Sequence, residues 1–116
     1  MGTFRLYAGA DQQAHIETID LKAKPDWLKG LAASQISFRE WPAGQFLDWH
    51  PAPRRQFMTC IAGAWETVDG TQQARRFKTG DVLLLEDTVG AGHLTRIIGD
   101  TDCLVQITVM PSEGER

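Results

Sequence analysis

The 116-residue chain lacks the features that mark several classes of protein. No apolar run approaches the ~20 residues that a membrane-spanning helix needs, so we expect no membrane partner. The first residues, MGTFRLYAGADQQ, hold neither a charged leader nor an apolar core, so we expect no secretory signal. Basic residues are not in excess, and a net charge of −3 with a pI of about 5.5 argues against nucleic-acid binding.

Cysteine is also scarce. Cys60 and Cys103 are too few for a disulfide framework and form no Cys-x-x-Cys motif. We expect two buried free thiols in a cytoplasmic protein, serving packing rather than catalysis, because neither has an activating base in the sequence. Hydrophobic residues make up 42% and charged residues 23%, which is typical of one ordinary globular domain.

Helical periodicity is poor, and glycine and proline divide the chain into short segments. The one helical candidate is PDWLKGLAA at residues 25–33, which Gly30 interrupts. A hairpin turn is predicted at Asp69-Gly70, because both central positions of a two-residue turn need φ > 0 and Asp-Gly is a favoured pair there. A second turn is predicted at residues 78–81. The apolar run VLLL is typical of a strand buried on both faces. The β-rich segments are QISFREW, RRQFMTCIAG, AWETV, RRFK, DVLLLE, LTRII and CLVQITVM. Such a series predicts an all-β sandwich or barrel.

The segment GQFLDWHPAPRRQFMTCIAG carries a regular spacing of glycine, histidine and polar residues. From Gly44, five residues lead to His50, one to Ala52, three to Gln56 and six to Gly63. This resembles the first motif of the cupin superfamily, G-x5-H-x-H-x3,4-E-x6-G. Every gap matches, while alanine and glutamine stand at the positions of the second histidine and the glutamate.

The segment GDVLLLEDTVGAGHLTR resembles the second cupin motif, G-x5-P-x-G-x2-H-x3-N. It begins at Gly80, and Glu86 stands at the proline position. His93 comes two residues late, since the loop at residues 87–92 carries the extra length, and Ile97 replaces the asparagine.

The resemblance implies an all-β double-stranded β-helix, the jelly-roll barrel of a small single-domain RmlC-like cupin, over residues 35–110. Residues 1–34 are then an N-terminal extension packed on the barrel, and residues 111–116 a C-terminal tail. Within the extension, we expect FRLY and HIETIDL to pair as edge strands and Trp27 to plug one end of the barrel. Small cupins commonly pair through sheet faces, so a homodimer is implied.

In cupins with the full motif, three histidines and a glutamate hold one divalent metal ion. Carried over, only His50 and His93 keep their identity, and Gln56 offers a carbonyl oxygen without charge. The resemblance implies either a weakened or lost metal site, or one Fe, Ni, Mn or Zn ion held by these three residues. Two imidazoles and an amide leave such an ion under-neutralised.

Three carboxylates could complete a set of two histidines and one acid. Asp48 lies two residues before His50 and should share its side of the strand, and Glu86 and Asp87 lie near the expected mouth. Without a metal, the two histidines would form an acid/base pair, or polar groups satisfied by hydrogen bonds.

Alternation places Gln56, Met58 and Cys60 on one strand face, which either lines a pocket or fills the barrel. Arg54 shares that parity, so we assign it as a bidentate clamp for a carboxylate substrate, with a solvated or interface salt bridge as the alternative. Arg55 should then face outward.

Tryptophans and one loop complete the candidate ligand site. Trp49, together with Trp41 and Trp65, would wall a pocket for a planar ligand or pack a dimer interface. The loop containing Asp87, which we add to the substrate-binding candidates, is either a mobile lid or a plain hairpin end.

Three functions follow. The first is a small-molecule-binding cupin with a pocket lined by His50, Gln56 and His93. The second is a metal-dependent oxygenase, isomerase or lyase acting on a small, carboxylated substrate. The third is a non-catalytic dimeric scaffold with a filled barrel. The fold hosts many chemistries, so it does not choose among them or decide whether the protein is an enzyme.

Overall fold

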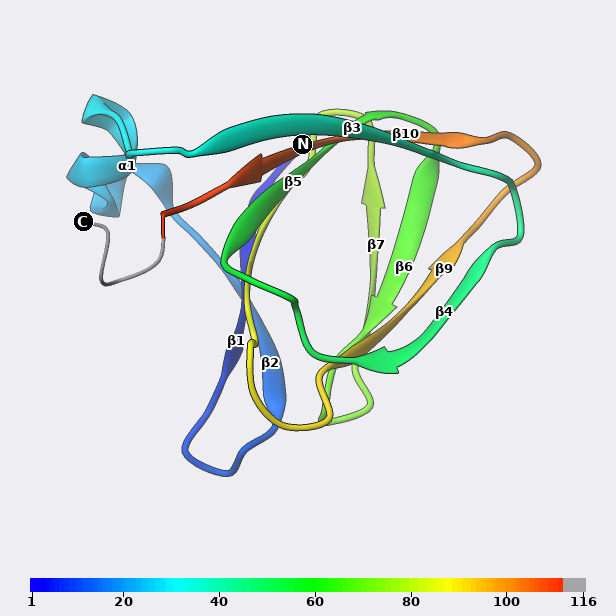
Figure 1. The fold of residues 1–116 in the computed structure, drawn as a ribbon, viewed down its shortest axis with the longest axis horizontal. Coiled ribbons are helices and arrows are strands. Elements are labelled where there is room, and N and C mark those ends of the chain that lie inside the picture. The colour runs from blue at the N-terminus through cyan, green and yellow to red at the C-terminus, as the bar shows by residue number, and fades with distance from the viewer. Residues whose placement is uncertain (112–116) are drawn as a thin grey trace.

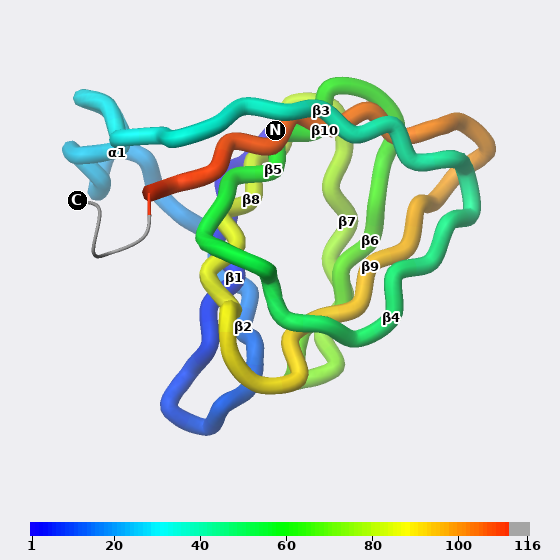
Figure 2. The backbone as a smooth tube through the Cα atoms, in the orientation of Figure 1, coloured from blue at the N-terminus to red at the C-terminus, as the bar shows by residue number. Residues whose placement is uncertain are grey.

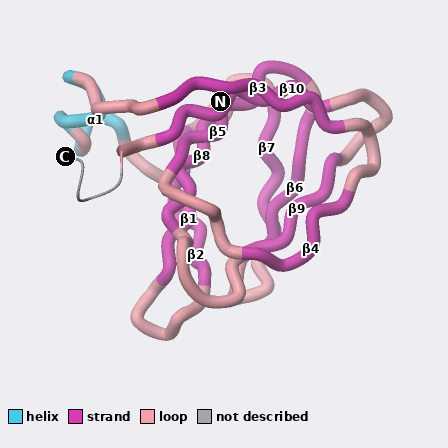
Figure 3. The backbone as a smooth tube through the Cα atoms, viewed as in Figure 1, coloured by secondary structure: helices cyan, strands magenta, loops and turns pink. Residues whose placement is uncertain are grey.

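A computed structural model describes residues 1–111, which form strands and two short helical turns (Figure 1). The strands are β1 (Thr3–Ala8), β2 (Ala14–Thr18), β3 (Gln35–Trp41), β4 (Phe46–His50), β5 (Gln56–Ala62), β6 (Ala64–Val68), β7 (Ala74–Lys78), β8 (Val82–Glu86), β9 (His93–Ile97) and β10 (Cys103–Val109). The helical turns are η1 (Leu21–Ala23) and α1 (Pro25–Lys29), and both lie at one end of the molecule (Figure 3). Within these residues no helix is long and apolar enough to cross a membrane.

Two sheets face each other and enclose the interior (Figures 1 and 2). One has six strands in the order β2-β1-β8-β5-β10-β3, and the other has four in the order β4-β9-β6-β7. All pairings are antiparallel except that of β1 with β8. The predicted all-β barrel is confirmed, and β3 and β6 coincide with the segments QISFREW and AWETV.

The core lies between the sheets. Trp65 and Phe77 are fully buried and stack with ring centroids 5.0 Å apart, and Phe4 meets Phe77 edge-on. Cys60 and Cys103 are buried free thiols, as expected. In β8 the three central leucines are all buried, which confirms a strand covered on both faces.

The predicted hairpin between β6 and β7 is present, but the two-residue turn is wrong. The connection is a loop of residues 69–73, and the positive φ falls on Gln72 (70°) rather than on Gly70. The carboxylate of the buried Asp69 shapes this loop, because its Oδ1 accepts hydrogen bonds from the N–H groups of Thr71 and Gln73. The Asp69 side chain therefore stabilises a longer loop in place of the two-residue turn, which would have needed a positive φ at Gly70.

The turn at residues 78–81 is confirmed. The N–H of Asp81 donates to the carbonyl of Lys78 at 2.9 Å, and Gly80 has the positive φ (92°) that the third position of such a turn requires.

The N-terminal strands pair as predicted, but only β2 is an edge strand. β1 lies between β2 and β8 and contributes Phe4 and Leu6 to the core. The predicted plug is also wrong, because Trp27 packs edge-on against Phe57, with ring centroids 5.1 Å apart. Phe57 alternates with two cavity-facing residues of β5, so this contact is on the outside of the barrel. The helix ends at Lys29, and the next residue, Gly30, takes a positive φ (136°).

Candidate functional site

A cavity of about 340 Å³ lies between the two sheets. Its walls come from β3, β4, β5, β8, β9, β10 and the loop between β4 and β5. The polar side chains that line it are those of Ser37, Arg39, His50, Arg54, Gln56, His93 and Thr95. The other lining residues are Trp41, Leu47, Pro51, Ala52, Pro53, Met58, Leu85 and Ile107. A concave wall that combines apolar side chains with convergent polar groups is typical of a small-molecule site.

Five of the predicted site residues meet in this cavity: His50, Arg54, Gln56, Met58 and His93. Two others lie outside it. Trp49 is 38% exposed and lines a separate groove, while Asp87 is fully buried behind His93.

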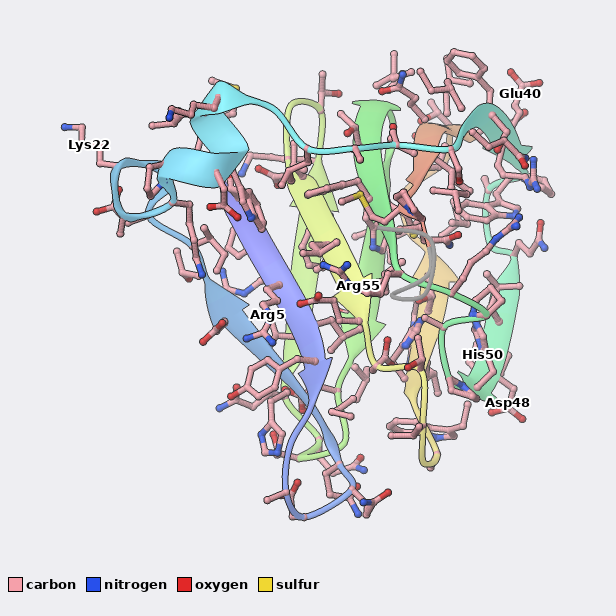
Figure 4. All side chains as sticks on the ribbon, turned by 60° about the vertical axis from the view of Figure 1, so that its left-hand side comes forward. Arg5, Lys22, Glu40, Asp48, His50 and Arg55 are labelled. Atoms are coloured by element: carbon pink, nitrogen blue, oxygen red, sulfur yellow. The ribbon has the colours of Figure 1, made fainter. Side chains whose placement is uncertain are left out.

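The expectation that Asp48 shares the cavity face with His50 is wrong. The pairing of β4 with β9 shifts register between Leu47 and His50, which breaks the alternation of side chains. Leu47 and His50 therefore both line the cavity, and Asp48, in the middle of β4, is exposed (Figure 4).

His50 and His93 are directly opposite in the β4–β9 pairing, and their ring centroids are 4.8 Å apart. The Nδ1 of His50 lies 2.6 Å from the carbonyl oxygen of Asp48, and the Nδ1 of His93 lies 2.5 Å from the Oδ2 of Asp87. A carbonyl and an ionised carboxylate only accept hydrogen bonds, so each Nδ1 donates. Each Nε2 is then the ring nitrogen left for a ligand.

Asp87 orients His93 from behind. Its side chain is fully buried, and its Oδ1 has no hydrogen-bond partner within residues 1–111. A buried carboxylate at Nδ1 fixes the tautomer and the ring plane of a histidine, whether that histidine binds a ligand or moves a proton.

The two arginines in the cavity carry its charge. In the part of the chain that the structure describes, neither Arg39 nor Arg54 lies within 4.0 Å of an acidic oxygen, and no acidic side chain lines the cavity. Arg55, by contrast, donates to Glu86 at 2.6 Å.

Glu86 does not reach the cavity, because it follows the cavity-lining Leu85 and points to the other side of β8. There it also accepts from Arg5 at 2.5 Å, so the carboxylate is held between the guanidinium groups of Arg5 and Arg55. Figure 4 labels these two arginines. Glu86 is paired outside the cavity, and Asp69 and Asp87 are buried elsewhere, so none of these three residues lines the cavity.

The donor set does not fit a resident divalent ion. Across residues 1–111, no group of three or more His, Cys, Asp or Glu side chains could hold a metal. The cavity offers two imidazoles and the Gln56 amide beside two arginines, while the carboxylate of Asp87 is engaged at a histidine Nδ1. Such a set lacks the negative charge that a divalent ion needs, so we derive no chemistry through a metal.

Arg39 and Thr95 were not among the sequence candidates. Arg39 was identifiable, since it alternates with Ser37 and Trp41 along QISFREW and all three line the cavity. Thr95 had no such signal. Its hydroxyl lies 3.3 Å from that of Thr67, to which the indole of Trp65 donates, so a buried hydrogen-bond chain runs from the core to the cavity wall.

Comparison with known proteins establishes the fold. No protein-family model matches the chain, and no curated protein sequence matches it. A Klebsiella pneumoniae protein with a double-stranded β-helix domain is 22% identical, with a TM-score of 0.53 over 67% of each chain. The cupin domain of Schizosaccharomyces pombe Cnp3 is 13% identical, with a TM-score of 0.54 over 88% of this chain and 76% of that one.

A protein of Thermotoga maritima described as a predicted oxalate decarboxylase is 14% identical, with a TM-score of 0.51 over 95% of this chain and 94% of that one. At these identities the likeness concerns the fold. The likeness agrees with the fold that the two sequence motifs implied. The chain therefore has the cupin fold, a double-stranded β-helix.

Proposed function

We propose that the protein binds a small carboxylated molecule in the barrel cavity, with Arg54 and Arg39 as the carboxylate-binding groups. The observation that carries the proposal is a cavity with two arginines free of ion pairs among the described residues and no acidic side chain in its wall. Guanidinium groups bind carboxylates in bidentate geometry, and both arginines are exposed, so a ligand can reach them from solvent.

The remaining lining suits the rest of such a ligand. The Nε2 atoms of His50 and His93 and the amide of Gln56 supply hydrogen bonds to polar substituents. Apolar side chains, among them Trp41 and Ile107, would cover the carbon skeleton. The volume of about 340 Å³ lies at the small end of the usual range for ligand pockets, which favours a compact metabolite.

The buried Asp87 behind His93 favours a second function, acid/base catalysis on the bound molecule. With its Nδ1 held by a carboxylate, the Nε2 of His93 could take up a proton from the ligand or deliver one to it. Of the three functions weighed from the sequence, the scaffold is the least supported, since it required a filled barrel.

Arg54 and Arg55, which are adjacent in the sequence, provide the test. Isothermal titration of the protein with acetate, pyruvate, succinate and benzoate should give saturable binding for at least one of them. Losing a charged hydrogen-bond donor costs about 1.5–3 kcal/mol, so Arg54→Gln should weaken binding by roughly 10-fold or more. Arg55→Gln is the matched control, because its side chain pairs with Glu86 outside the cavity. Equal affinities of these two variants for every acid would contradict the proposal.

Metal content decides between the proposed binder and the metal-dependent enzyme. Elemental mass spectrometry of untagged protein should find no stoichiometric iron, nickel, manganese or zinc. A stoichiometric metal that disappears in the double variant His50→Ala/His93→Ala would overturn the metal-free site.

A further inference from the structure

A second hollow, distinct from the barrel cavity, lies where three loops meet the end of β4. Its volume is about 280 Å³, and we call it the loop groove. It is lined by Gln13, Trp49, Gly70, Gln72, Ala91 and Gly92. These residues come from the β1–β2, β6–β7 and β8–β9 loops, which gather at the lower end of the barrel in Figure 1.

Backbone packing separates the loop groove from the cavity. Trp49 lines the groove, whereas the next residue, His50, lines the cavity. Gly92 packs so closely on this strand that a Cβ there would lie 2.0 Å from the carbonyl oxygen of His50. The two sites therefore share a wall, and a ligand in one does not occupy the other.

Hydrogen bonds from the β6–β7 loop to strand β2 hold one wall of the loop groove in place. Asp69 is 1% exposed, and its carboxylate accepts from the N–H of Ile16 in β2 as well as from its own loop. The N–H of Gly70 donates to the carbonyl of Ala14 at 2.8 Å. Loops that are already ordered cost little entropy when a ligand binds.

The chemistry of the lining is neutral and mixed. Trp49 offers a partly exposed indole, and Gln13 and Gln72 offer two primary amides. Among the hydrogen bonds of residues 1–111, neither amide side chain has a partner, and no charged side chain lines the groove. A neutral lining does not compensate the charge of a phosphate or a carboxylate, so an anionic ligand is disfavoured.

We propose that the loop groove binds a neutral sugar ring stacked on Trp49 and hydrogen-bonded through Gln13 and Gln72. A pyranose has an apolar C–H face, which suits the electron-rich face of an indole, and hydroxyls around its rim. Each hydroxyl both donates and accepts a hydrogen bond, and a primary amide offers both functions.

Trp49 can be observed directly, because the chain has four tryptophans and hence four indole N–H resonances. The probes are the methyl pyranosides of glucose, galactose and mannose, added to protein with ¹⁵N-labelled tryptophan. At least one sugar should shift the Trp49 signal in a saturable manner, with a Kd of about 1 mM, as suits an open groove. The Trp65 signal should stay in place, because its N–H donates to Thr67 inside the core.

Variants make the test specific. Trp49→Ala should abolish sugar binding, and Gln72→Ala should weaken it by about 5-fold or more, since one hydrogen bond is lost. Trp27→Ala, which changes a tryptophan outside the groove, and Arg54→Gln, which changes only the cavity, should both bind as the wild type does. If circular dichroism shows that Trp49→Ala is unfolded, Gln72→Ala and Gln13→Ala carry the comparison.

Three results would overturn the proposal. The first is an unmoved Trp49 signal with all three sugars at about ten times the expected Kd. The second is a response to benzoate or adenosine but to no sugar, which would mean a planar-ring site. The third is sugar binding that survives both glutamine variants.

Discussion

Replacing Gly92 with alanine should destabilise the protein far more than the same change at another glycine of similar backbone conformation. Gly92 has φ of 76°, and a Cβ there would lie 2.0 Å from the carbonyl oxygen of His50 and 2.4 Å from the nitrogen of Pro51. Both contacts are to backbone, so the strand must move. Gly99 has φ of 85°, but its Cβ would meet no atom within 4 Å.

The magnitude follows from two contributions. A left-handed φ costs an alanine about 1–2 kcal/mol at either site, partly offset by the lower entropy of the unfolded chain. Overpacking against backbone adds about 1–3 kcal/mol at Gly92 alone. We therefore expect losses of about 2–4 kcal/mol for Gly92→Ala and about 1 kcal/mol for Gly99→Ala. At about 4 °C per kcal/mol for a domain of this size, Tm should fall by about 8–16 °C and 4 °C respectively.

Thermal unfolding followed by circular dichroism would measure both values, and urea unfolding would give the free energies. Since His50 lies on the displaced strand, Gly92→Ala should also weaken ligand binding in the cavity, while Gly99→Ala should not. Equal Tm values for the two variants would refute the close approach of Gly92 to the β4 backbone.

Four further outcomes are expected. Phe77→Ala removes the ring stacked on Trp65 and should cost about 3–5 kcal/mol by urea unfolding, whereas a loss below 1 kcal/mol would contradict a tight core. Burial raises the pKa of the Cys60 thiol to about 12, so an aromatic disulfide reagent at pH 8 should react with it about 10³-fold more slowly than with free cysteine. The buried thiol stays protonated in the folded protein at pH values where it ionises in the unfolded chain. Its contribution to the free energy of unfolding is therefore lost as pH rises from about 9 to 12. A free energy of unfolding that does not change over this pH range would be inconsistent with the burial. The implied homodimer stays a prediction: sedimentation should give a dimer that Ile36→Lys/Phe38→Lys dissociates, since these side chains are 59% and 58% exposed on β3, and a monomeric wild type would exclude it.

The strands of the barrel were predictable because each one is marked in its own segment of the sequence, by alternation of polar and apolar side chains and by turn residues at its ends. The segment QISFREW became β3 and AWETV became β6 without a change of boundary. The spacing that starts at Gly44 also identified Gln56 as a residue of the barrel interior, where it is 9% exposed.

What the sequence did not predict depends on contacts between distant segments. Asp48 was misplaced because a bulge, set by the pairing of β4 with β9, interrupts the alternation. The turn at Gly70 was misjudged because the carboxylate of Asp69 binds both its own loop and β2. The role of Asp87 as the partner of His93 depends on how the loop between them folds back.

The parallel pairing of β1 with β8 constrains the order in which the chain can fold during synthesis. β1 is synthesised before its neighbour β8, which ends only at Glu86. Until then the hairpin of β1 and β2 has no sheet to join, and the side chains of Phe4 and Leu6 stay in water. Since such distant pairings slow folding, the nascent hairpin of β1 and β2 remains exposed to aggregation, or to binding by a chaperone, until β8 has been synthesised.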